Sequence, residues 1–449
     1  MSRVVALIDG EHYPPVVRFA LDELSREYDV VAAVFLGGTE KVDLEAGEAA
    51  YGLPVVWGRD AASALREAIE RYGPDEVVDL SDEPVVSSED RLVLASLAVG
   101  LGVGYRGADF TFTAELFQAT PKTPAMRIIG TGKRVGKTSI SAYAARLLKA
   151  DGVDLVVLAM GRGGPVEPEL IRGDEVELTT EDLLALAAQG KHASSDNYED
   201  AVMSRVTTVG CRRCGGGLAG KTFFSNVAEG VDLADSLGKE LLILEGSGAA
   251  MPPAGADSTL LIVGAAQGER YVREYFGPFR VALADAVLIA AAEEPNATAE
   301  EVDAIRAAIA EVSPEGDTPP VVATTFRPQP LADISGRRVF FATTAPAAVL
   351  PSLVGHLEED HGAHVVASSP HLSDRARLRQ DIREAAGDFD VMLTELKAAA
   401  IDVAAAAAEE AGVETVLCDN APVPVDGGDL DAVIRDVARC AIERAEERE

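Results

Sequence analysis

A glycine-rich turn that runs into Lys-Thr is the segment of this chain with the clearest chemistry. Residues 126–138 read MRIIGTGKRVGKT, a short apolar run followed by the turn and by a predicted helix. Backbone N–H groups in such a turn point at an anion, and the start of the helix adds positive potential. In this layout Lys137 reaches the β- and γ-phosphates of a nucleotide, and the Thr138 hydroxyl helps to hold Mg²⁺. The turn residues that we expect to surround the phosphates are Gly130, Thr131, Gly132, Val135, Gly136, Lys137, Thr138 and Ser139.

The residues after the turn support this prediction. Apolar side chains recur at helical spacing from Ile140 to Leu148, so a helix with one apolar face follows the turn. One position departs from the usual spacing, which has glycine where this chain has Thr131. The alternative is a glycine-rich turn without a ligand. Lysine is scarce, with 9 among 40 cations, and we therefore assign Lys133, inside the turn, a catalytic role.

Two further strand ends carry candidate catalytic residues. The apolar run 241–244 ends in Glu245, and a carboxylate at that place in a nucleotide-binding sheet holds Mg²⁺ opposite the phosphate turn. Its alternative is a carboxylate that merely ends a strand. The run 155–160 is followed by Arg162, in the string MGRGGP, where ligands bind in open α/β sheets. Arg162 is positioned to contact a transferring phosphoryl group, or else belongs to a simple turn.

A second unusual string, CRRCGGGLAGK, covers residues 211–221. Glycines next to cations suit close backbone approach to phosphate, with arginine making bidentate contacts. A zinc site is an alternative, but there is one CxxC and the remaining two cysteines are remote in sequence. The string could also form a redox dithiol or a flexible surface loop. The substrate-binding candidates from this string are Arg212, Arg213, Gly215, Gly216, Gly217 and Lys221.

The distribution of charge indicates an anionic ligand. The chain carries 74 acidic and 40 basic residues, a net charge of −34, which argues against nucleic acid or an anionic membrane as partner. Two windows, 116–150 and 201–228, contain no acidic residue, and they include the two glycine-rich strings. We expect a small, strongly anionic substrate to bind at both. Four cysteines and the absence of a long apolar run predict a cytoplasmic protein without a membrane span.

Apolar β-rich runs alternate with helical segments along the chain, which predicts an α/β fold with largely parallel sheets. We expect a P-loop NTPase-like central parallel sheet flanked by N-terminal and C-terminal α/β units. The predicted domains are a Rossmann- or flavodoxin-like domain over 1–120, an ATP-binding domain over 121–330 and a C-terminal α/β domain over 331–449. The long connection between the second and third central strands predicts a substrate-binding insertion over 161–240.

The N-terminal unit contributes one candidate, His12. It follows the predicted strand Val4–Ile8 in the string DGEHYPP, together with Asp9 and Glu11. This position is at the ligand-binding edge of a parallel sheet, so we include His12 among the substrate-binding candidates. The alternative is a structural histidine.

These motifs resemble those of known protein families. GTGKRVGKT followed by LILEGSG resembles the dethiobiotin synthetase branch of P-loop proteins, over the middle segment only. The whole chain resembles the cyclic 2,3-diphosphoglycerate synthetase family, through DGEHYPP, the phosphate turn, AMGRGGP, CRRCGGGLAGK and LEGSG in that order. The early lysine of partition ATPases would fall at Gly132, and here Lys133 follows one place later.

The resemblance implies a cytoplasmic, homodimeric, ATP-dependent ligase. Such an enzyme closes the two phosphates of 2,3-diphosphoglycerate into an internal anhydride and releases ADP and phosphate. Lys137, Thr138 and Glu245 would then bind ATP and Mg²⁺. The residues implied to hold substrate phosphates are Arg162, Arg212, Arg213 and Lys221.

Two different functions stay open at this point. A kinase that phosphorylates a phosphoglycerate and stops would use the same site. A non-catalytic, nucleotide-switched regulator of the partition-ATPase type would also need the phosphate turn. Such regulators usually carry an exposed amphipathic or basic partner-binding segment, and this sequence shows none outside the two acid-free windows.

Overall fold

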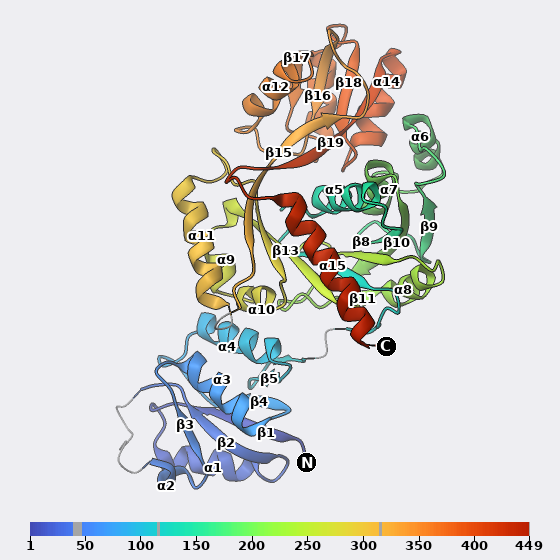
Figure 1. The fold of residues 1–449 in the computed structure, drawn as a ribbon. Coiled ribbons are helices and arrows are strands. Elements are labelled where there is room, and N and C mark those ends of the chain that lie inside the picture. The colour runs from blue at the N-terminus through green and yellow to red at the C-terminus, as the bar shows by residue number, and fades with distance from the viewer. Residues whose placement is uncertain (39–46, 115–116, 314–316, 449) are drawn as a thin grey trace. The chain divides into compact units, whose positions relative to one another are not determined.

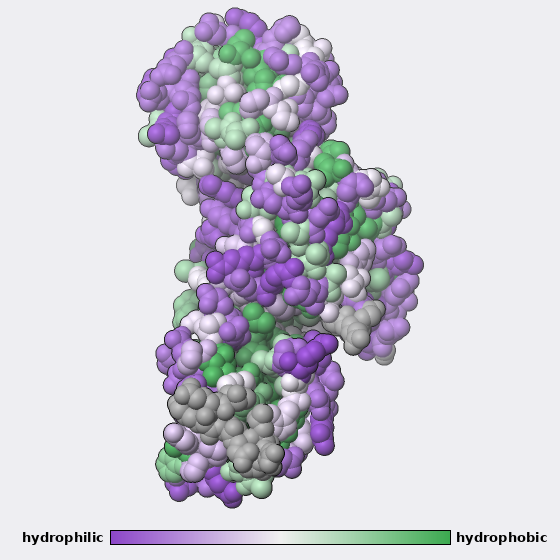
Figure 2. Space-filling model, turned by 90° about the vertical axis from the view of Figure 1, so that its left-hand side faces the viewer, coloured by the Kyte–Doolittle hydropathy of each residue, from purple (hydrophilic) through white to green (hydrophobic). Residues whose placement is uncertain are grey.

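The computed structural model describes residues 1–38, 47–114, 117–313 and 317–448 (Figure 1). The chain forms two compact units: residues 1–116, 269–283 and 306–318 make the first, and the rest makes the second. These units differ from the predicted domains, because two segments from the middle of the chain pack with the N-terminal unit. In the described part of the chain, no helix has both the length and the apolarity to span a membrane. The face shown in Figure 2 is largely hydrophilic, as expected from a chain with 25% charged residues.

The first unit is a six-stranded sheet in the order β3-β2-β1-β4-β5-β6. Its first five strands are parallel, and β6 is antiparallel to β5. This is the strand order of a doubly wound sheet that changes direction between β1 and β4. Its strands are β1 (Arg3–Ile8), β2 (Asp29–Phe35), β3 (Val55–Trp57), β4 (Glu76–Asp79), β5 (Gly104–Arg106) and β6 (Thr111–Phe112). Its helices are α1 (Pro14–Leu24), α2 (Gly47–Tyr51), α3 (Ala61–Tyr72), α4 (Ser88–Gly100), α9 (Arg270–Arg273) and α10 (Gly277–Ala282).

The second unit is built on one 13-stranded sheet, ordered β11-β10-β8-β12-β7-β13-β14-β15-β19-β18-β16-β17, with β9 paired to β10. Its N-terminal strands are β7 (Ala125–Gly130), β8 (Leu155–Gly161), β9 (Glu169–Arg172), β10 (Thr207–Cys214), β11 (Phe224–Ser225), β12 (Leu241–Glu245), β13 (Ser258–Gly264) and β14 (Ala286–Ala290). The remaining strands are β15 (Val321–Pro330), β16 (Arg338–Ala342), β17 (His364–Ser369), β18 (Val391–Glu395) and β19 (Glu414–Pro424). The predicted α/β class with a parallel P-loop sheet is confirmed.

Helices cover both faces of this sheet (Figure 1). They are α5 (Lys137–Ala150), α6 (Thr180–Ala188), α7 (Asp196–Ser204), α8 (Val227–Asp235), the first half of α11 (Ala299–Val312), α12 (Leu350–Glu359), α13 (Arg375–Glu384), α14 (Ala406–Ala411) and α15 (Leu430–Arg448). The central strands β7, β8, β12, β13 and β14 are buried at every position. Strands covered on both faces have continuous apolar runs, and this pattern made them visible in the sequence. The alanine-rich segment after β18 forms a π-helix, Ala400–Ala405, continued by α14.

One strand joins the P-loop part of the sheet to the C-terminal part. The first half of β15 pairs in parallel with β14, and its second half pairs antiparallel with β19. Strands β16, β17 and β18 run parallel to β19. Because β19 is antiparallel to β15, the C-terminal strands run in the direction opposite to the P-loop strands. The carboxyl ends of the two groups therefore face each other.

Two segments differ in place from the sequence prediction. The region 161–240, interpreted as an insertion, contains β10, which is a strand of the main sheet paired in parallel with β8. Helix α15, assigned from the sequence to the C-terminal domain, packs on β7 and β13 of the P-loop sheet. Its buried residues Leu430, Ile434 and Val437 belong to the same core cluster as Met126 and Leu260. The apolar face of α15 covers strands that would otherwise be open to water.

The packing of α15 gives a prediction for stability. Ile434 is fully buried, so Ile434→Ala should lower the free energy of unfolding by about 2–5 kcal/mol, through lost burial and the cavity left behind. Arg439→Ala, at an exposed position of the same helix, should change it by less than about 0.5 kcal/mol. Urea unfolding followed by circular dichroism measures both. Equal losses in the two variants would contradict the packing of α15 on this core.

Candidate functional site

The phosphate turn connects β7 to α5, which begins at Lys137. Gly136 caps this helix with a φ of 89°, in the left-handed region that favours glycine. A Cβ atom there would lie 2.1 Å from Cζ of Phe326. Conformation and close contact thus both require glycine at this position. Thr131, where glycine is usual, is buried, and its backbone N–H donates to the carbonyl of Ile262 at 3.0 Å.

Lys137 lies inside the turn. Its Nζ donates to the carbonyl oxygen of Gly132 at 2.8 Å, and its side chain is buried. Burial lowers the pKa of Lys137 to about 8, although the carboxylates of Glu245 and Asp196 oppose this shift. An anion bound in the turn would stabilise the charged amine and so raise the pKa of Lys137 again. Lys133 is exposed, and it lines the same cavity as Lys137, a cavity described in full below.

Thr138 and Glu245 lie side by side, as the sequence predicts for a magnesium site. The Thr138 hydroxyl donates to Oε1 of Glu245 at 2.6 Å. Oε2 of Glu245 and both carboxyl oxygens of Asp200 are buried and accept no bond from an amide, amine or alcohol of the described residues. Burial raises the pKa of Glu245, and burial together with Glu245 raises that of Asp200. Glu245 and Asp200 share a hydrogen bond between their carboxyl groups, and a buried carboxyl pair of this kind is suited to a cation.

These residues fit Mg²⁺, which binds through hydroxyl and carboxylate oxygens and usually keeps waters and substrate phosphates as further ligands. Thr138 and Glu245 would hold the ion. Within the described ranges, no group of three or more His, Cys, Asp or Glu side chains is arranged to hold a metal by itself. The zinc alternative for Cys211 and Cys214 therefore gains no support there, and neither cysteine is in a disulfide.

Helix α7 and Lys397 add a group that the sequence analysis missed. Asp196 and Glu199, at the start of α7, line the cavity together with Lys397. Nζ of Lys397 lies 3.1 Å from Oε1 of Glu199 and 3.5 Å from Oγ of Ser139. Burial alone would lower the pKa of Lys397, but its carboxylate neighbours raise it. Lys397 thus stays charged and connects the C-terminal part of the sheet to α5 and α7.

A weak sequence pattern could have found Lys397. Lysine is rare in this chain, and Lys397 is the only one after residue 240 in the sequence. Three of the remaining lysines lie in the glycine-rich turns, so scarcity already marked lysine as informative. Nothing in the local sequence, however, places Lys397 near the phosphate turn.

Arg162 lines the site, and Arg213 lies beside it, at the second cavity that Arg162 also lines. Arg162 follows β8 and lines the cavity next to the phosphate turn. Arg213, on β10, donates to the carbonyl of Ser247 at 2.7 Å and to that of Gly215 at 3.0 Å. Burial and the nearby Arg162 lower the pKa of Arg213. Two cations held this close together favour an anion between them.

The rest of the 211–221 string is placed differently. Arg212 donates from Nε to the carbonyl of Pro165 at 2.6 Å and from Nη2 to that of Gly164 at 3.0 Å. Its guanidinium therefore fixes the loop after β8, at the edge of a second cavity of about 580 Å³ that Arg162 and Arg213 also line. The remaining candidates are exposed and lie outside the residues that line either cavity: Gly215, Gly216, Gly217 and Lys221.

His12 belongs to the first unit and is tied to its own loop. Its Nδ1 lies 2.9 Å from Oδ1 of Asp9, which is fully buried. Asp9 also accepts the backbone N–H groups of Glu11, His12 and Asp82. Asp9 thus organises the loops after β1 and β4. A substrate-binding role for His12 stays a prediction.

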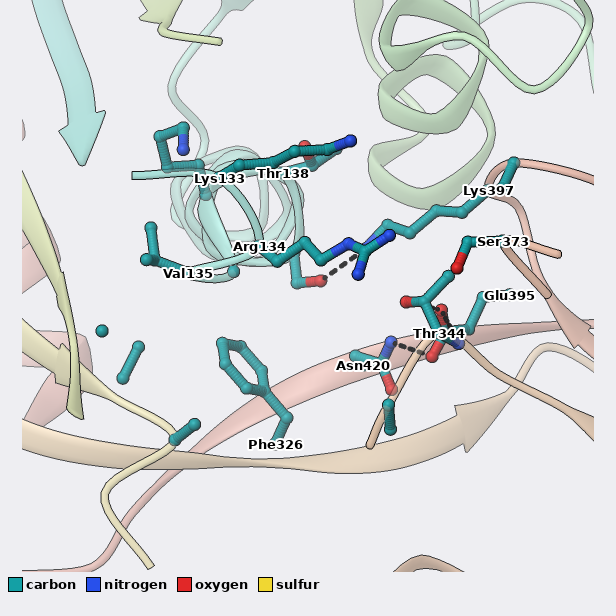
Figure 3. A pocket seen from close by; sticks show the side chains of 18 of the residues that line it. Lys133, Arg134, Val135, Thr138, Phe326, Thr344, Ser373, Glu395, Lys397 and Asn420 are labelled. Atoms are coloured by element: carbon teal, nitrogen blue, oxygen red, sulfur yellow. Dashed lines mark hydrogen bonds between the residues drawn. The ribbon is translucent and has the colours of Figure 1, made fainter. Parts of the chain in front are cut away.

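The main cavity has a volume of about 920 Å³. One wall is the carboxyl edge of the P-loop strands, with the phosphate turn, Arg162 and Glu245. The opposite wall is the carboxyl edge of the C-terminal strands, where Thr344, Glu395 and Asn420 lie together (Figure 3). This volume is near the upper end for small-molecule sites, so the cavity has room for two ligands.

A phosphate turn that ends in Lys-Thr, opposite a strand-end carboxylate on a parallel sheet, defines a P-loop nucleotide-binding protein. Comparison with models of protein families agrees with this class and also identifies the family. Residues 125–323 match "Cyclic 2,3-diphosphoglycerate synthetase, P-loop domain", residues 3–113 match the N-terminal domain of that synthetase, and residues 330–421 match its C-terminal domain.

Full-length relatives carry the same name. The chain is 45% identical to the cyclic 2,3-diphosphoglycerate synthetase of Methanothermus fervidus, over 98% of both chains. It is 50% identical to that of Thermococcus kodakarensis, over 95% of this chain and 96% of the relative. It is 47% identical to that of Rubrobacter xylanophilus, over 98% of both. The chain therefore belongs to the cyclic 2,3-diphosphoglycerate synthetase family of enzymes, and the resemblance noted in the sequence is confirmed.

Proposed function

We propose that this protein is an ATP-dependent ligase that converts 2,3-diphosphoglycerate into cyclic 2,3-diphosphoglycerate, with release of ADP and phosphate. The observation that supports it best is that Arg162 lines the cavity of the nucleotide-phosphate turn and that a second cation, Arg213, lies beside it, since both guanidinium groups approach Gly248 of the same cavity wall. A cytoplasmic location and a homodimeric state are part of the proposal and rest on the family resemblance.

The reaction needs two phosphoryl transfers. In the first, an oxygen of one substrate phosphate attacks the γ-phosphorus of ATP, and the bond to the β-γ bridging oxygen breaks to release ADP. In the second, an oxygen of the neighbouring substrate phosphate attacks the phosphorus just activated. The P–O bond to the terminal group breaks, inorganic phosphate leaves, and the ring anhydride forms. Atoms and charge balance without an added oxidant or acid.

The protein's residues have to align anions that repel one another. Lys137 and the N–H groups of the turn hold the β- and γ-phosphates, and Arg162 and Arg213 hold the substrate phosphates on the adjacent side. When bound at Thr138 and Glu245, Mg²⁺ neutralises charge on the nucleotide phosphates. Lys133, exposed at the edge of the turn, adds positive charge where the two ligands meet.

Phosphorus NMR of the purified protein with ATP, Mg²⁺ and 2,3-diphosphoglycerate tests this proposal. We expect a cyclic pyrophosphate signal, with ADP and inorganic phosphate formed in equal amounts. A phosphorylated acid without free phosphate would instead show a kinase. ATP hydrolysis that no phosphorylated acid accelerates would show a nucleotide-switched regulator.

Arg213→Ala should raise the KM for 2,3-diphosphoglycerate about 10- to 100-fold and leave the KM for ATP nearly unchanged. The reason is that a charge-assisted hydrogen bond to the substrate is lost while the phosphate turn stays intact. Steady-state kinetics with each substrate varied measures the two constants. Arg172→Ala is the control, since it removes an exposed arginine of the neighbouring strand β9 that pairs with Glu175. A larger shift in the KM for ATP than in that for the acid would contradict the assignment.

A further inference from the structure

The main cavity has two chemically different halves, one on each side of the phosphate turn. On the side of β12, β8 and β10 the lining includes Arg162, Lys137 and His192. On the side of β13, β14 and β15, and along the segment from Thr344 to Leu353, the described lining residues include no lysine or arginine, and the nearest cations are Arg134 of the turn and Lys397 at the edge of this half (Figure 3). Small and apolar side chains dominate there: Ala265, Ala266, Ala290, Ala291, Phe326, Ala345, Pro346, Ala347, Val349 and Leu353.

The strand order fixes these halves on opposite sides. Strand β7, which leads into the turn, lies between β12 and β13 in the sheet. A ligand whose terminal phosphates lie in the turn can therefore extend either toward the cations or toward the apolar half. The second anionic substrate needs the cations, because an apolar wall cannot balance the charge of its phosphates. The uncharged part of the nucleotide is left with the apolar half.

Phe326 supplies a surface for a flat ring. It lies on β15, lines the cavity and touches the phosphate turn, since a Cβ atom on Gly136 would lie 2.1 Å from its Cζ. In Figure 3 the ring of Phe326 lies below Val135 and Arg134 of the turn, on the side of Asn420. A base that stacks on an aromatic ring gains from both burial and ring contact.

Asn420 supplies a direction for a hydrogen bond. Its Nδ2 donates to Oε1 of Glu395 at 3.1 Å. Glu395 also accepts from the hydroxyl and the N–H of Thr344, at 2.7 and 3.1 Å, so it acts purely as an acceptor. The amide nitrogen of Asn420 must therefore face Glu395, and its carbonyl oxygen is turned away (Figure 3). An acceptor oxygen in this wall suits a ligand that presents an N–H donor.

From these contacts we infer that the C-terminal part of the chain forms the nucleoside half of the ATP site and selects adenine over guanine. The base lies against Phe326 and the Thr344–Leu353 segment. Its exocyclic amine donates to Oδ1 of Asn420. Guanine presents a carbonyl oxygen at the corresponding position, which would face the acceptor oxygen of Asn420 without a proton between them. This inference rests on the proposed use of ATP.

Binding to the full-length protein by isothermal titration calorimetry tests it, with ADP, GDP and tripolyphosphate as ligands in the presence of Mg²⁺. The native chain should bind ADP about 10- to 100-fold more tightly than GDP. Asn420→Ala should weaken ADP binding about 10-fold and leave GDP binding within about twofold. Ala347→Trp, at an exposed position that is safe for folding, should block the base and weaken ADP binding by about 10-fold or more. Tripolyphosphate has no base, so neither variant should affect it.

Two further variants serve as controls with opposite expected effects on ADP binding. Arg213→Ala should leave ADP binding unchanged, whereas Lys137→Ala should abolish binding of both ADP and tripolyphosphate. If ADP binding depends on Lys137 but not on Asn420 or Ala347, the inference is overturned and the proposed function stands. A shift in the KM for the phosphorylated acid, in place of ADP affinity, in the Asn420 and Ala347 variants would also overturn it. If neither ligand depends on Lys137, the proposed function itself fails.

Discussion

Lys137→Ala should lower the rate of cyclic product formation by at least about 100- to 1000-fold, the loss expected when one preorganised charge at a transferring phosphoryl group is removed. Nζ of Lys137 is held in the turn by the carbonyl of Gly132, so its position does not depend on a bound ligand. Alanine removes both this charge and the only buried amine of the turn. Release of inorganic phosphate and of ADP, followed in the same assay, measures the loss.

Lys149→Ala is the matched control, because Lys149 lies at the opposite end of the same helix and is exposed. Its removal should leave the rate within about twofold. Lys137→Arg is a further test of geometry. Arginine keeps the charge, but its larger fork does not fit beside Gly132, so activity should stay low. Full activity in Lys137→Arg would show that charge near the turn is enough.

The phosphate turn and Glu245 could be predicted because their patterns are local. The turn, the Lys-Thr pair and the helix follow one another within 126–148, and residues close in sequence determine each of them. The buried parallel strands were visible for the same reason, as continuous apolar runs between helices. The structure places Thr138 and Glu245 in contact although they are 107 residues apart, because β7 and β12 are adjacent strands.

The rest of the site depends on contacts that leave no local pattern. Lys397 reaches Ser139 across 258 residues of sequence, and only the antiparallel pairing of β15 with β19 turns the C-terminal strands toward the turn. Arg212 and Arg213 are equivalent in the sequence, yet alternate residues of a strand point to opposite faces. One guanidinium therefore fixes the loop at Pro165, and its neighbour faces the site.

Glu245→Gln should also nearly abolish turnover, and it should do so without destabilising the protein. Glutamine keeps an oxygen that can accept from the Thr138 hydroxyl, but it is a far weaker ligand for Mg²⁺ than a carboxylate. We expect the rate to fall about 100- to 1000-fold, measured as release of inorganic phosphate at saturating substrates. A higher Mg²⁺ concentration should restore little of the lost rate, because the variant lacks the carboxylate that binds the ion inside the site.

The same substitution, Glu245→Gln, should not lower the stability of the protein. Glu245 is buried beside Asp200 and near Asp196, and burial raises its pKa, so the folded protein disfavours this negative charge. Removing the charge should leave the free energy of unfolding unchanged or raise it by about 1–2 kcal/mol in the absence of nucleotide and Mg²⁺. Glu240→Gln, just before the amino end of the same strand, is exposed and should change neither rate nor stability. A variant that is both inactive and less stable would indicate that Glu245 supports the fold rather than the reaction.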